Sequence, residues 1–274
     1  MNVLDNLDKI KRLIIDNLLY DNVKYVYLAG SVMEGFGNET SDIDVYVIVD
    51  GDLDVEISKE VKGRSLKDTN NFVNNFIDNG IRYDYEYWSL SDWLNTINKL
   101  NNLIPEDPGF LKVLSTSDLD LLHRIKFAKP ILNEECFLQN YSQINFENLE
   151  FYMASIKSEG YSNLLEDVEG ALLSKDLKSA FIMVRLLLDE TLSGFLAAHG
   201  ETNPKHKWIY KKLSNYSKIS DEKEILNMYM NLLTQPKNLE CDDELVHYIK
   251  SVIRFSQKLN IQTQNKLLQK EIKI

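Results

Sequence analysis

Two aspartates at the start of an apolar strand constrain this chain more than any other feature of its sequence. The segment "SDIDVYVIVD", residues 41–50, places Asp42 and Asp44 one residue apart, immediately before a run of apolar residues. Side chains in a strand alternate between faces, so the two carboxylates share one face while the intervening apolar side chains point into the core. Paired carboxylates repel one another unless a cation lies between them. Carboxylate oxygens suit Mg²⁺, so the segment predicts a metal site at the beginning of a strand.

Two flanking segments add matching chemistry. "VKYVYLAG" predicts a strand that ends at Gly30 and Ser31. Glycine lets the backbone approach a phosphate closely, and the serine offers a hydroxyl and a helix N-terminal amide. "IRYDYEYWS", residues 81–89, predicts another strand with Asp84 and Glu86 on one face and tyrosines on the other. If these strands are neighbours, three carboxylates converge.

Helical periodicity surrounds the strands. Residues up to Tyr20 repeat leucine and isoleucine at spacings of three and four, which predicts an amphipathic helix. "SLKDTNNFVNNFIDNG", residues 65–80, predicts a helix with Phe72, Phe76 and Ile77 inward and Gly80 as its C-terminal stop. "LSDWLNTINKLNNL", residues 90–103, predicts another helix. Helices that alternate with strands favour one small mixed sheet.

The second half of the chain carries helical periodicity with few breakers. The pattern becomes helical from about Asp118, with a long helix ending near Gly200 and further helices from Asp221 onward. We therefore expect an α+β chain with two domains. Residues 1–140 are expected to form a small mixed-sheet domain, and residues 141–274 an all-α helical bundle.

Composition excludes several functional classes. The net charge of −11 has the wrong sign for a protein that attracts phosphate non-specifically, so no nucleic-acid partner is expected. No apolar run approaches the roughly 20 residues of a membrane span, and the N-terminus does not resemble a signal peptide. Cys136 and Cys241 lack metal-ligand spacing and are expected to be reduced thiols. A cytoplasmic protein is the simplest expectation, and its acidity either keeps it soluble or attracts a cationic substrate.

The order Gly30-Ser31, then Ser41-Asp42-Ile43-Asp44, then an acid on a later strand resembles the nucleotidyltransferase superfamily, which includes DNA polymerase β. The resemblance is closest to the small bacterial aminoglycoside nucleotidyltransferases. The motif spans about residues 25–90, and "LLHRIKFAKPIL" is similar to the segment that closes the catalytic domain of those enzymes. The helical half is similar only in kind, since many members carry a C-terminal helical domain.

The resemblance implies a mechanism for nucleotidyl transfer. Two Mg²⁺ ions would bridge the triphosphate of an NTP, with ATP as the expected donor, and neutralise charge at the α-phosphorus. A hydroxyl of the acceptor would then displace pyrophosphate. The residues that would bind metal and phosphates are Gly30, Ser31, Ser41, Asp42 and Asp44.

A third acid would complete the site. It would orient or deprotonate the attacking hydroxyl, and both Asp84 and Glu86 lie on the correct face of their strand. We expect Asp84 to be the acid nearer the metal and Glu86 to be the base beside the acceptor, with the choice of catalytic acid left open between them.

A basic cluster stands out in the otherwise acidic helical half. "HGETNPKHKWIYKKL", residues 199–213, gathers four lysines around Trp208. In similar enzymes a lysine of the helical domain reaches the triphosphate, and Lys207 is the candidate here because a flexible ammonium can act as a mobile point charge. The alternative is a solvated basic face at the start of a helix.

Other charged residues of the helical half have structural interpretations. Arg185 and Asp189, four residues apart in an apolar helix, predict a buried salt bridge. His199 and His206 have no third metal ligand at a sensible spacing, so we interpret them as structural. The acidic run at residues 240–244 suits a solvated loop better than a receptor for an amino-sugar.

Three functional hypotheses follow. The first is an Mg²⁺-dependent nucleotidyltransferase that modifies a small-molecule hydroxyl, with an antibiotic-resistance role if the acceptor is aminoglycoside-like. The second keeps the chemistry but makes the acceptor a protein or a tRNA, as in toxin–antitoxin nucleotidyltransferases, which usually lack so large a helical half. The third is a non-catalytic nucleotide-binding protein on the same scaffold. The possibility of a homodimer is left open.

Overall fold

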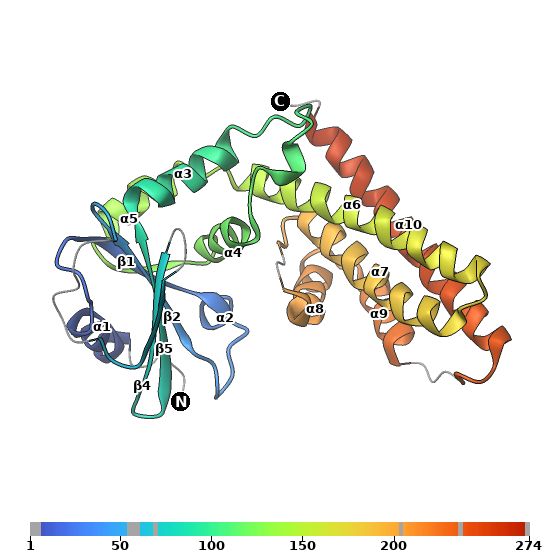
Figure 1. Ribbon diagram of the computed structural model, residues 1–274, viewed down its shortest axis with the longest axis horizontal. Coiled ribbons are helices and arrows are strands. Elements are labelled where there is room, and N and C mark those ends of the chain that lie inside the picture. Colours follow the sequence, from blue (N-terminus) through green and yellow to red (C-terminus); the bar gives the residue numbers. More distant parts are fainter. Residues whose placement is uncertain (1–6, 54–60, 68–70, 203–204, 235–237, 272–274) are drawn as a thin grey trace. The chain divides into compact units, whose positions relative to one another are not determined.

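The computed structural model describes residues 7–53, 61–67, 71–202, 205–234 and 238–271 of the chain. It divides into two compact units, the sheet unit Met1–Asn145 and the helical unit Phe146–Ile274. Each unit has a hydrophobic core of its own. The α+β class expected from the sequence is therefore confirmed, with a mixed sheet followed by a long helical region (Figure 1).

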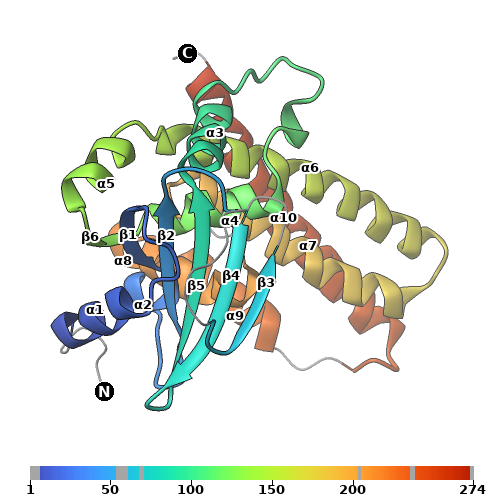
Figure 2. The same ribbon diagram turned by 60° about the vertical axis from the view of Figure 1, so that its left-hand side comes forward.

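The sheet unit is built around a six-stranded mixed sheet with the order β3-β4-β5-β2-β1-β6 (Figure 2). Strands β2 and β5 are parallel, and every other neighbouring pair is antiparallel. Strand β2 is thus an interior strand between β1 and β5. The strands are β1 (Val23–Ala29), β2 (Ile43–Val49), β3 (Arg64–Lys67), β4 (Asn71–Asp78), β5 (Ile81–Ser89) and β6 (Lys129–Leu132).

One face of the sheet carries an aliphatic and tyrosine core. The alternate residues of β2 that begin with Ile43 pack with the tyrosines of β5 and with the apolar residues of α1 (Leu7–Asp16). The Tyr85 hydroxyl donates a hydrogen bond of 3.3 Å to the Ile14 carbonyl, which satisfies a polar group that this core buries. The expected first helix and the expected alternation in β2 and β5 are both present.

The opposite face is aromatic at its centre. The rings of Tyr27 and Tyr46 stack with centroids 5.1 Å apart. Trp93 of α3 (Leu90–Asn101) and Phe137 of α5 (Glu134–Tyr141) both pack against Tyr25, at 5.8 and 5.9 Å. Large rings bury much apolar area per residue. This packing fills the middle of the face, while the charged residues lie toward its edge.

The helix expected over residues 65–80 is wrong. Residues 64–67 and 71–78 form β3 and β4, and positions 68–70 lie outside the described residues. Phe72 and Phe76 are buried as expected, because a spacing of four also fits the two-residue period of a strand. Ile77 was expected to point inward but is 73% exposed, since it lies on the opposite face of β4 from Phe76. Asn79 and Gly80, with φ of 49° and 79°, form the two-residue turn into β5. An Asn-Gly pair favours this kind of hairpin turn because both positions need positive φ.

A second difference lies in the segment that was expected to be helical from about Asp118. Helix α4 (Thr116–Ile125) is present, but Lys129–Leu132 then forms β6, antiparallel to β1. Pro130 suits this position because β6 is an edge strand, where a residue without an N–H loses no ladder hydrogen bond. The strand closes the sheet on the β1 side.

The helical unit is a packed set of helices. Helices α6, α7 and α10 lie alongside one another (Figure 1), and α8 packs with α9. Helix α7 ends at Ala198, close to the expected Gly200, whose φ of +89° suits the end of a helix. The helices are α6 (Phe146–Leu173), α7 (Leu177–Ala198), α8 (Ile209–Ile219), α9 (Lys223–Thr234) and α10 (Asp242–Glu271), with a 3₁₀ turn at His206–Trp208.

Among the described helices, none combines the length and apolarity needed to cross a bilayer.

Two glycines test the backbone argument. Gly80→Ala should destabilise the protein by about 1–2 kcal/mol because a Cβ is costly at positive φ, although the space around it is open. Gly170→Ala should instead stabilise by about 0.5–1 kcal/mol, because this glycine lies within α6 with nothing near its Cβ position. Chemical denaturation of both variants measures the two values. If both substitutions changed the free energy of unfolding by the same amount and in the same direction, the assignment of Asn79 and Gly80 to a hairpin turn would be contradicted.

Candidate active site

The aspartate that opens β2 lies next to an aspartate of β5. Asp44 pairs in register with Asp84 on one side and with Ala29 of β1 on the other. Because paired residues of neighbouring strands point to the same face, both carboxylates lie on one face of the sheet. Asp42 immediately precedes β2, and its charge acts on Asp44. Three acids are thus brought to the same end of the sheet.

Gly30 lies directly against the Asp44 carboxylate. It begins the short helix α2 (Gly30–Met33) with φ of +77°, a region that favours glycine. A Cβ at this position would overlap the Asp44 carboxylate and would lie 3.1 Å from Arg124 Nη1. Both backbone conformation and close packing therefore require glycine here. The backbone of Gly30, at the end of β1, therefore lies so close to the Asp44 carboxylate that no side chain fits between them.

Arg124 of α4 is the cationic partner of Asp44. Its Nη1 lies 2.7 Å from Asp44 Oδ1, and its Nε lies 2.8 Å from Asp120 Oδ2 one turn earlier on the same helix. The Asp44 and Arg124 side chains are each only 16% exposed. Asp120 thus fixes the arginine in place while the guanidinium faces the sheet.

His123, next to Arg124 on α4, contacts the C-terminal end of α2. His123 Nε2 lies 2.8 Å from Glu34 Oε1, and both side chains are about 95% buried, with 4% and 5% exposed. Glu34 is the C-cap residue of α2. Helix α4 therefore contacts both the strand that carries Asp44 and the turn that carries Gly30 and Ser31, which fixes these segments relative to each other.

The electrostatics of Asp44 favour a cation. The pKa of its carboxyl is raised to about 6, chiefly because the group is buried. Arg124 opposes this rise, whereas the charges of Asp42 and Asp84 add to it. The ionised form of Asp44 is therefore under-compensated even with one arginine present. Burying acids this close is costly unless a further positive charge neutralises them.

Asp84 and Glu86 differ in their partners. Arg82 holds both oxygens of Asp84, with Nε 2.7 Å from Oδ1 and Nη2 2.9 Å from Oδ2. Glu86 Oε1 accepts hydrogen bonds from Asn71 Nδ2 at 3.0 Å and from the indole of Trp88 at 2.8 Å. Glu86 pairs with Tyr46, two positions along β2 from Asp44. Of the two acids on β5, Asp84 is therefore the one that lies directly opposite Asp44 on the neighbouring strand.

The two serines of the site lie in the turns around it. Ser31 is half-buried in α2, directly after Gly30. Ser41 lies in the turn before Asp42, where its hydroxyl accepts a hydrogen bond of 2.8 Å from the Asn38 amide. That turn fixes the entry of the chain into β2. Both hydroxyls remain near the edge of the sheet at which the acids gather.

The donor set fits magnesium. The described residues contain no group of three or more His, Cys, Asp or Glu side chains that could hold a metal on their own. Mg²⁺ does not need such a group, since one or two carboxylates with waters and substrate phosphates suffice. Asp42 and Asp44 supply such a pair, and within the described part of the chain Asp42 has no ion-pair partner. The chemistry of the site therefore agrees with a metal shared with a triphosphate.

Sequence reasoning missed the residues that contact these acids. Arg82 precedes Asp84 by two positions and shares its face, a signal that strand alternation could have provided. Arg124 and His123 are separated from Asp44 and Glu34 by about 80 to 90 positions. No local period reveals such pairs. The only hint is that two basic residues interrupt the apolar run "LLHRI".

The basic cluster of the helical unit only partly matches the expectation. Lys207 and Lys211 lie over the Trp208 ring, with Nζ 4.9 and 5.0 Å from its centroid. Lys212 is instead buried, with Nζ 3.5 Å from Glu201 Oε2. The lysines gathered around Trp208 in the sequence thus include two that form cation–π contacts with its ring. A role in phosphate binding stays a prediction.

The expected salt bridge between Arg185 and Asp189 is wrong within the described residues. The guanidinium of Arg185 lies 5.7 Å from the Phe181 ring centroid. Asp189 instead accepts a hydrogen bond of 3.2 Å from the hydroxyl of Tyr229. Arg185 is half-buried. Its guanidinium can therefore stack on the Phe181 ring and still form hydrogen bonds with water, so it needs no ion pair.

His199 and the acidic run have structural surroundings. His199 Nδ1 lies 2.7 Å from the Phe195 carbonyl, and burial lowers the pKa of its imidazole. Glu240 forms an exposed ion pair of 2.9 Å with Lys178, and Glu244 accepts a hydrogen bond from the Asn238 amide. These contacts are typical of helix termini.

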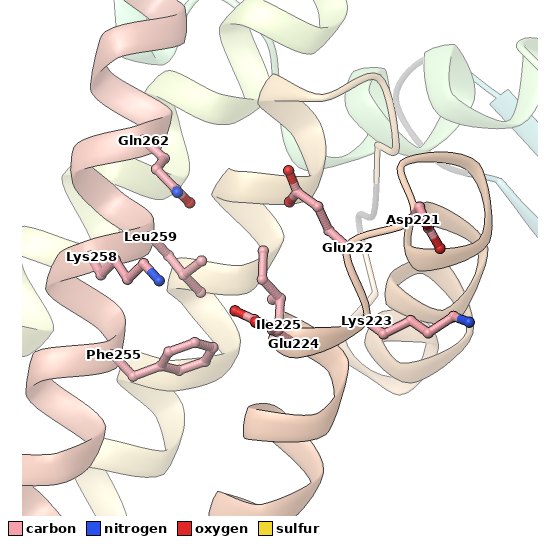
Figure 3. Close-up of a pocket in the computed structure, with 9 residues that line it drawn as sticks. All are labelled: Asp221, Glu222, Lys223, Glu224, Ile225, Phe255, Lys258, Leu259 and Gln262. Carbon is pink, nitrogen blue, oxygen red and sulfur yellow. The ribbon is translucent and has the colours of Figure 1, made fainter.

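A polar hollow of about 400 Å³ lies within the helical unit, between α10 and the start of α9 (Figure 3). Its floor is apolar, with Ile225, Phe255 and Leu259. Glu222 and Gln262 line it and also line an adjoining hollow beside His199. Lys223 and Lys258 also line the hollow, so its charged side chains are of both signs.

Replacing Asp44 by asparagine tests the charge balance of the site. The folded-state pKa of about 6 exceeds the ordinary 3.8, so ionisation opposes folding above pH 6 and has no effect well below pH 4. Without metal at pH 7.5, Asp44→Asn should therefore stabilise by roughly 1–3 kcal/mol, at 1.36 kcal/mol per pKa unit. At pH 4 the gain should fall below about 1 kcal/mol.

Denaturant unfolding in EDTA at both pH values measures these differences. Asp16→Asn, at an exposed position of α1, is the matched control and should change little. A destabilised Asp44→Asn protein at pH 7.5 would show that the ion pair with Arg124 outweighs the cost of burial.

Part of the sheet unit is similar to a known domain family. Residues 7–101, which include β1, α2, β2 and β5, match the nucleotidyltransferase domain family. No curated protein matches the chain. A solved nucleotidyltransferase-like protein from Exiguobacterium sibiricum 255-15 is 14% identical, with a TM-score of 0.48 over 96% of this chain and 78% of that one. Residues 7–101 are thus similar to the nucleotidyltransferase domain family, and this match supports the nucleotidyltransferase superfamily for that part of the sheet unit.

Proposed function

We propose that the protein is an Mg²⁺-dependent enzyme that transfers a nucleoside monophosphate, with ATP as the donor, to a hydroxyl of a small molecule in the cytoplasm. The observation that carries this proposal is the placement of Asp44. It lies beside Asp84, next to the charge of Asp42 and against the backbone of Gly30, within a nucleotidyltransferase domain. Acids gathered around a glycine turn suit a metal-bound triphosphate.

The residues divide the work between binding and chemistry. Asp42 and Asp44 would hold the metal, with Asp84 beside them, and the turn at Gly30 and Ser31 would face the phosphates. Bound metal would supply charge neutralisation at the α-phosphorus. The acceptor oxygen attacks that phosphorus, the bond to the β-phosphate oxygen breaks, and pyrophosphate leaves.

Glu86 is the proposed base for the acceptor hydroxyl. It lies on the face of Asp84 but two positions farther along the sheet, so it can receive the hydroxyl proton beyond the metal-binding acids. Asn71 and Trp88 hold one of its oxygens. Such hydrogen bonds orient the carboxylate and leave its second oxygen for substrate.

The acceptor is proposed to be an amine-bearing, aminoglycoside-like molecule. The net charge of −11 would attract a cation over a distance. Lys207, on its short 3₁₀ turn, is proposed to contact the triphosphate as a point charge.

Pyrophosphate release tests the proposal. The purified protein should release pyrophosphate with Mg²⁺, ATP and at least one member of an aminoglycoside panel, and less with the other NTPs. Asp44→Asn should lower the rate at least about 10³-fold, since it removes a charge that neutralises the metal. Lys178→Gln, in an exposed ion pair of the helical unit, is the control and should retain activity.

Two other results would change the assignment. Mg²⁺-dependent ATP binding without turnover on any small acceptor, followed by labelling of a protein or a tRNA, would replace the acceptor class. Failure to bind any NTP would contradict the proposed function itself.

The roles of the two acids on β5 can be separated. Asp84→Asn should raise the Mg²⁺ concentration needed for half-maximal rate about tenfold, because it removes a charge beside Asp44. Glu86→Gln should lower kcat by about 10²–10⁴ with an unchanged Mg²⁺ requirement, as loss of a general base does. Steady-state rates over a Mg²⁺ series measure both. The reverse pattern would exchange the two roles.

A further inference from the structure

We propose that Arg124 is an internal counter-ion that competes with metal for Asp44 and moves to the phosphates when a metal-bound triphosphate arrives. The inference rests on the proposed function, because it assigns Asp44 to the metal. It adds a role for a residue of α4, which lies outside the matched domain at residues 7–101. The consequence is that metal and nucleotide bind together rather than separately.

Arg124 occupies a carboxylate oxygen that a metal would use. Its Nη1 lies 2.7 Å from Asp44 Oδ1, and the two side chains are equally buried at 16% exposure. The other oxygen of Asp44, Oδ2, lies against Gly30. A guanidinium at hydrogen-bonding distance from one oxygen and a divalent ion on the same carboxylate would repel each other at short range.

Arg124 also forms an ion pair with a second carboxylate, that of Asp120. Its Nε lies 2.8 Å from Asp120 Oδ2, one helical turn away on α4. If the contact with Asp44 breaks, this second carboxylate still keeps the guanidinium at the site. Arg124 therefore need not leave for solvent, and its remaining N–H groups become available to another anion.

The proposed phosphate turn is within reach of Arg124. Arg124 Nη1 lies 3.1 Å from the position of a Cβ on Gly30. A planar guanidinium binds two phosphate oxygens at once, and a triphosphate with one divalent ion still carries net negative charge. The arriving complex would supply both the metal for Asp44 and the anion for Arg124.

A purely structural role would have different consequences. If Arg124 only fastened α4 to β2, its loss would loosen Asp44 and weaken the binding of metal and nucleotide alike. The counter-ion role predicts opposite signs. Metal alone should bind more tightly without Arg124, whereas nucleotide should bind more weakly. The coupling between the two ligands should shrink in both directions, since such coupling is reciprocal.

The test uses the full chain, with Mn²⁺ as the metal and a non-hydrolysable α,β-methylene ATP analogue as the nucleotide. Electron paramagnetic resonance measures Mn²⁺ affinity at pH 8 with and without the analogue, and calorimetry measures analogue affinity in the presence of Mn²⁺. Arg124→Gln should bind Mn²⁺ alone about tenfold more tightly and the analogue about tenfold more weakly than the wild type, the size expected when one charged contact is lost. Arg12→Gln, an exposed arginine of α1, should match the wild type in both.

A second variant covers the case in which glutamine prevents folding. Arg124→Lys keeps the charge but cannot hold two carboxylates through one planar group, so it should shift both affinities in the same directions, by about threefold. Unchanged or weaker binding of Mn²⁺ alone in the folded variants would overturn the proposal. A wild-type protein that binds neither Mn²⁺ nor the analogue would instead contradict the proposed function, so the two failures are distinguishable.

Discussion

The site depends on the contact between the Asp44 carboxylate and the backbone of Gly30. No other residue fits at position 30, because its φ is positive and a Cβ would overlap the carboxylate. This contact brings the end of β1, the start of β2 and helix α2 to one place. Helix α4 then holds the arrangement from one side, through Arg124 on Asp44 and His123 on Glu34. The sheet supplies the acids, and α4 contributes the arginine that pairs with Asp44.

The arrangement has an energetic cost that the proposed metal-binding role would offset. Asp44 is buried among like charges, and its raised pKa shows that one arginine does not fully compensate it. A structural role would be served better by an apolar residue at this position, since the alternate residues of β2 on the other face form a dry core. Strained or under-compensated groups tend to cluster where ligands bind. The matched nucleotidyltransferase domain gives this cost a reason.

Much of this could be predicted from the sequence, and the limits have physical causes. Strand alternation predicted that Asp84 and Glu86 share one face of their strand, because the two-residue period is rigid wherever one face is buried. Their convergence with Asp44 depended on the two strands being neighbours, which the sheet confirms. The hairpin of β4 and β5 was missed because a spacing of four between Phe72 and Phe76 fits both a helix and a strand. The ion pair of Arg124 with Asp44 joins residues far apart in the chain, and such contacts leave no local period. The domain match ends at residue 101 and likewise leaves α4 outside.

The position of the bound metal decides whether Asp42 and Asp44 form a metal site. A crystal structure of the protein with Mn²⁺ and a non-hydrolysable ATP analogue, with anomalous data collected at the manganese edge, would locate the metal independently of any activity. The account predicts a manganese peak bound by Asp42 and Asp44, with the triphosphate against the turn at Gly30 and Ser31. Manganese and nucleotide bound elsewhere, with the contact between Arg124 and Asp44 intact, would contradict it.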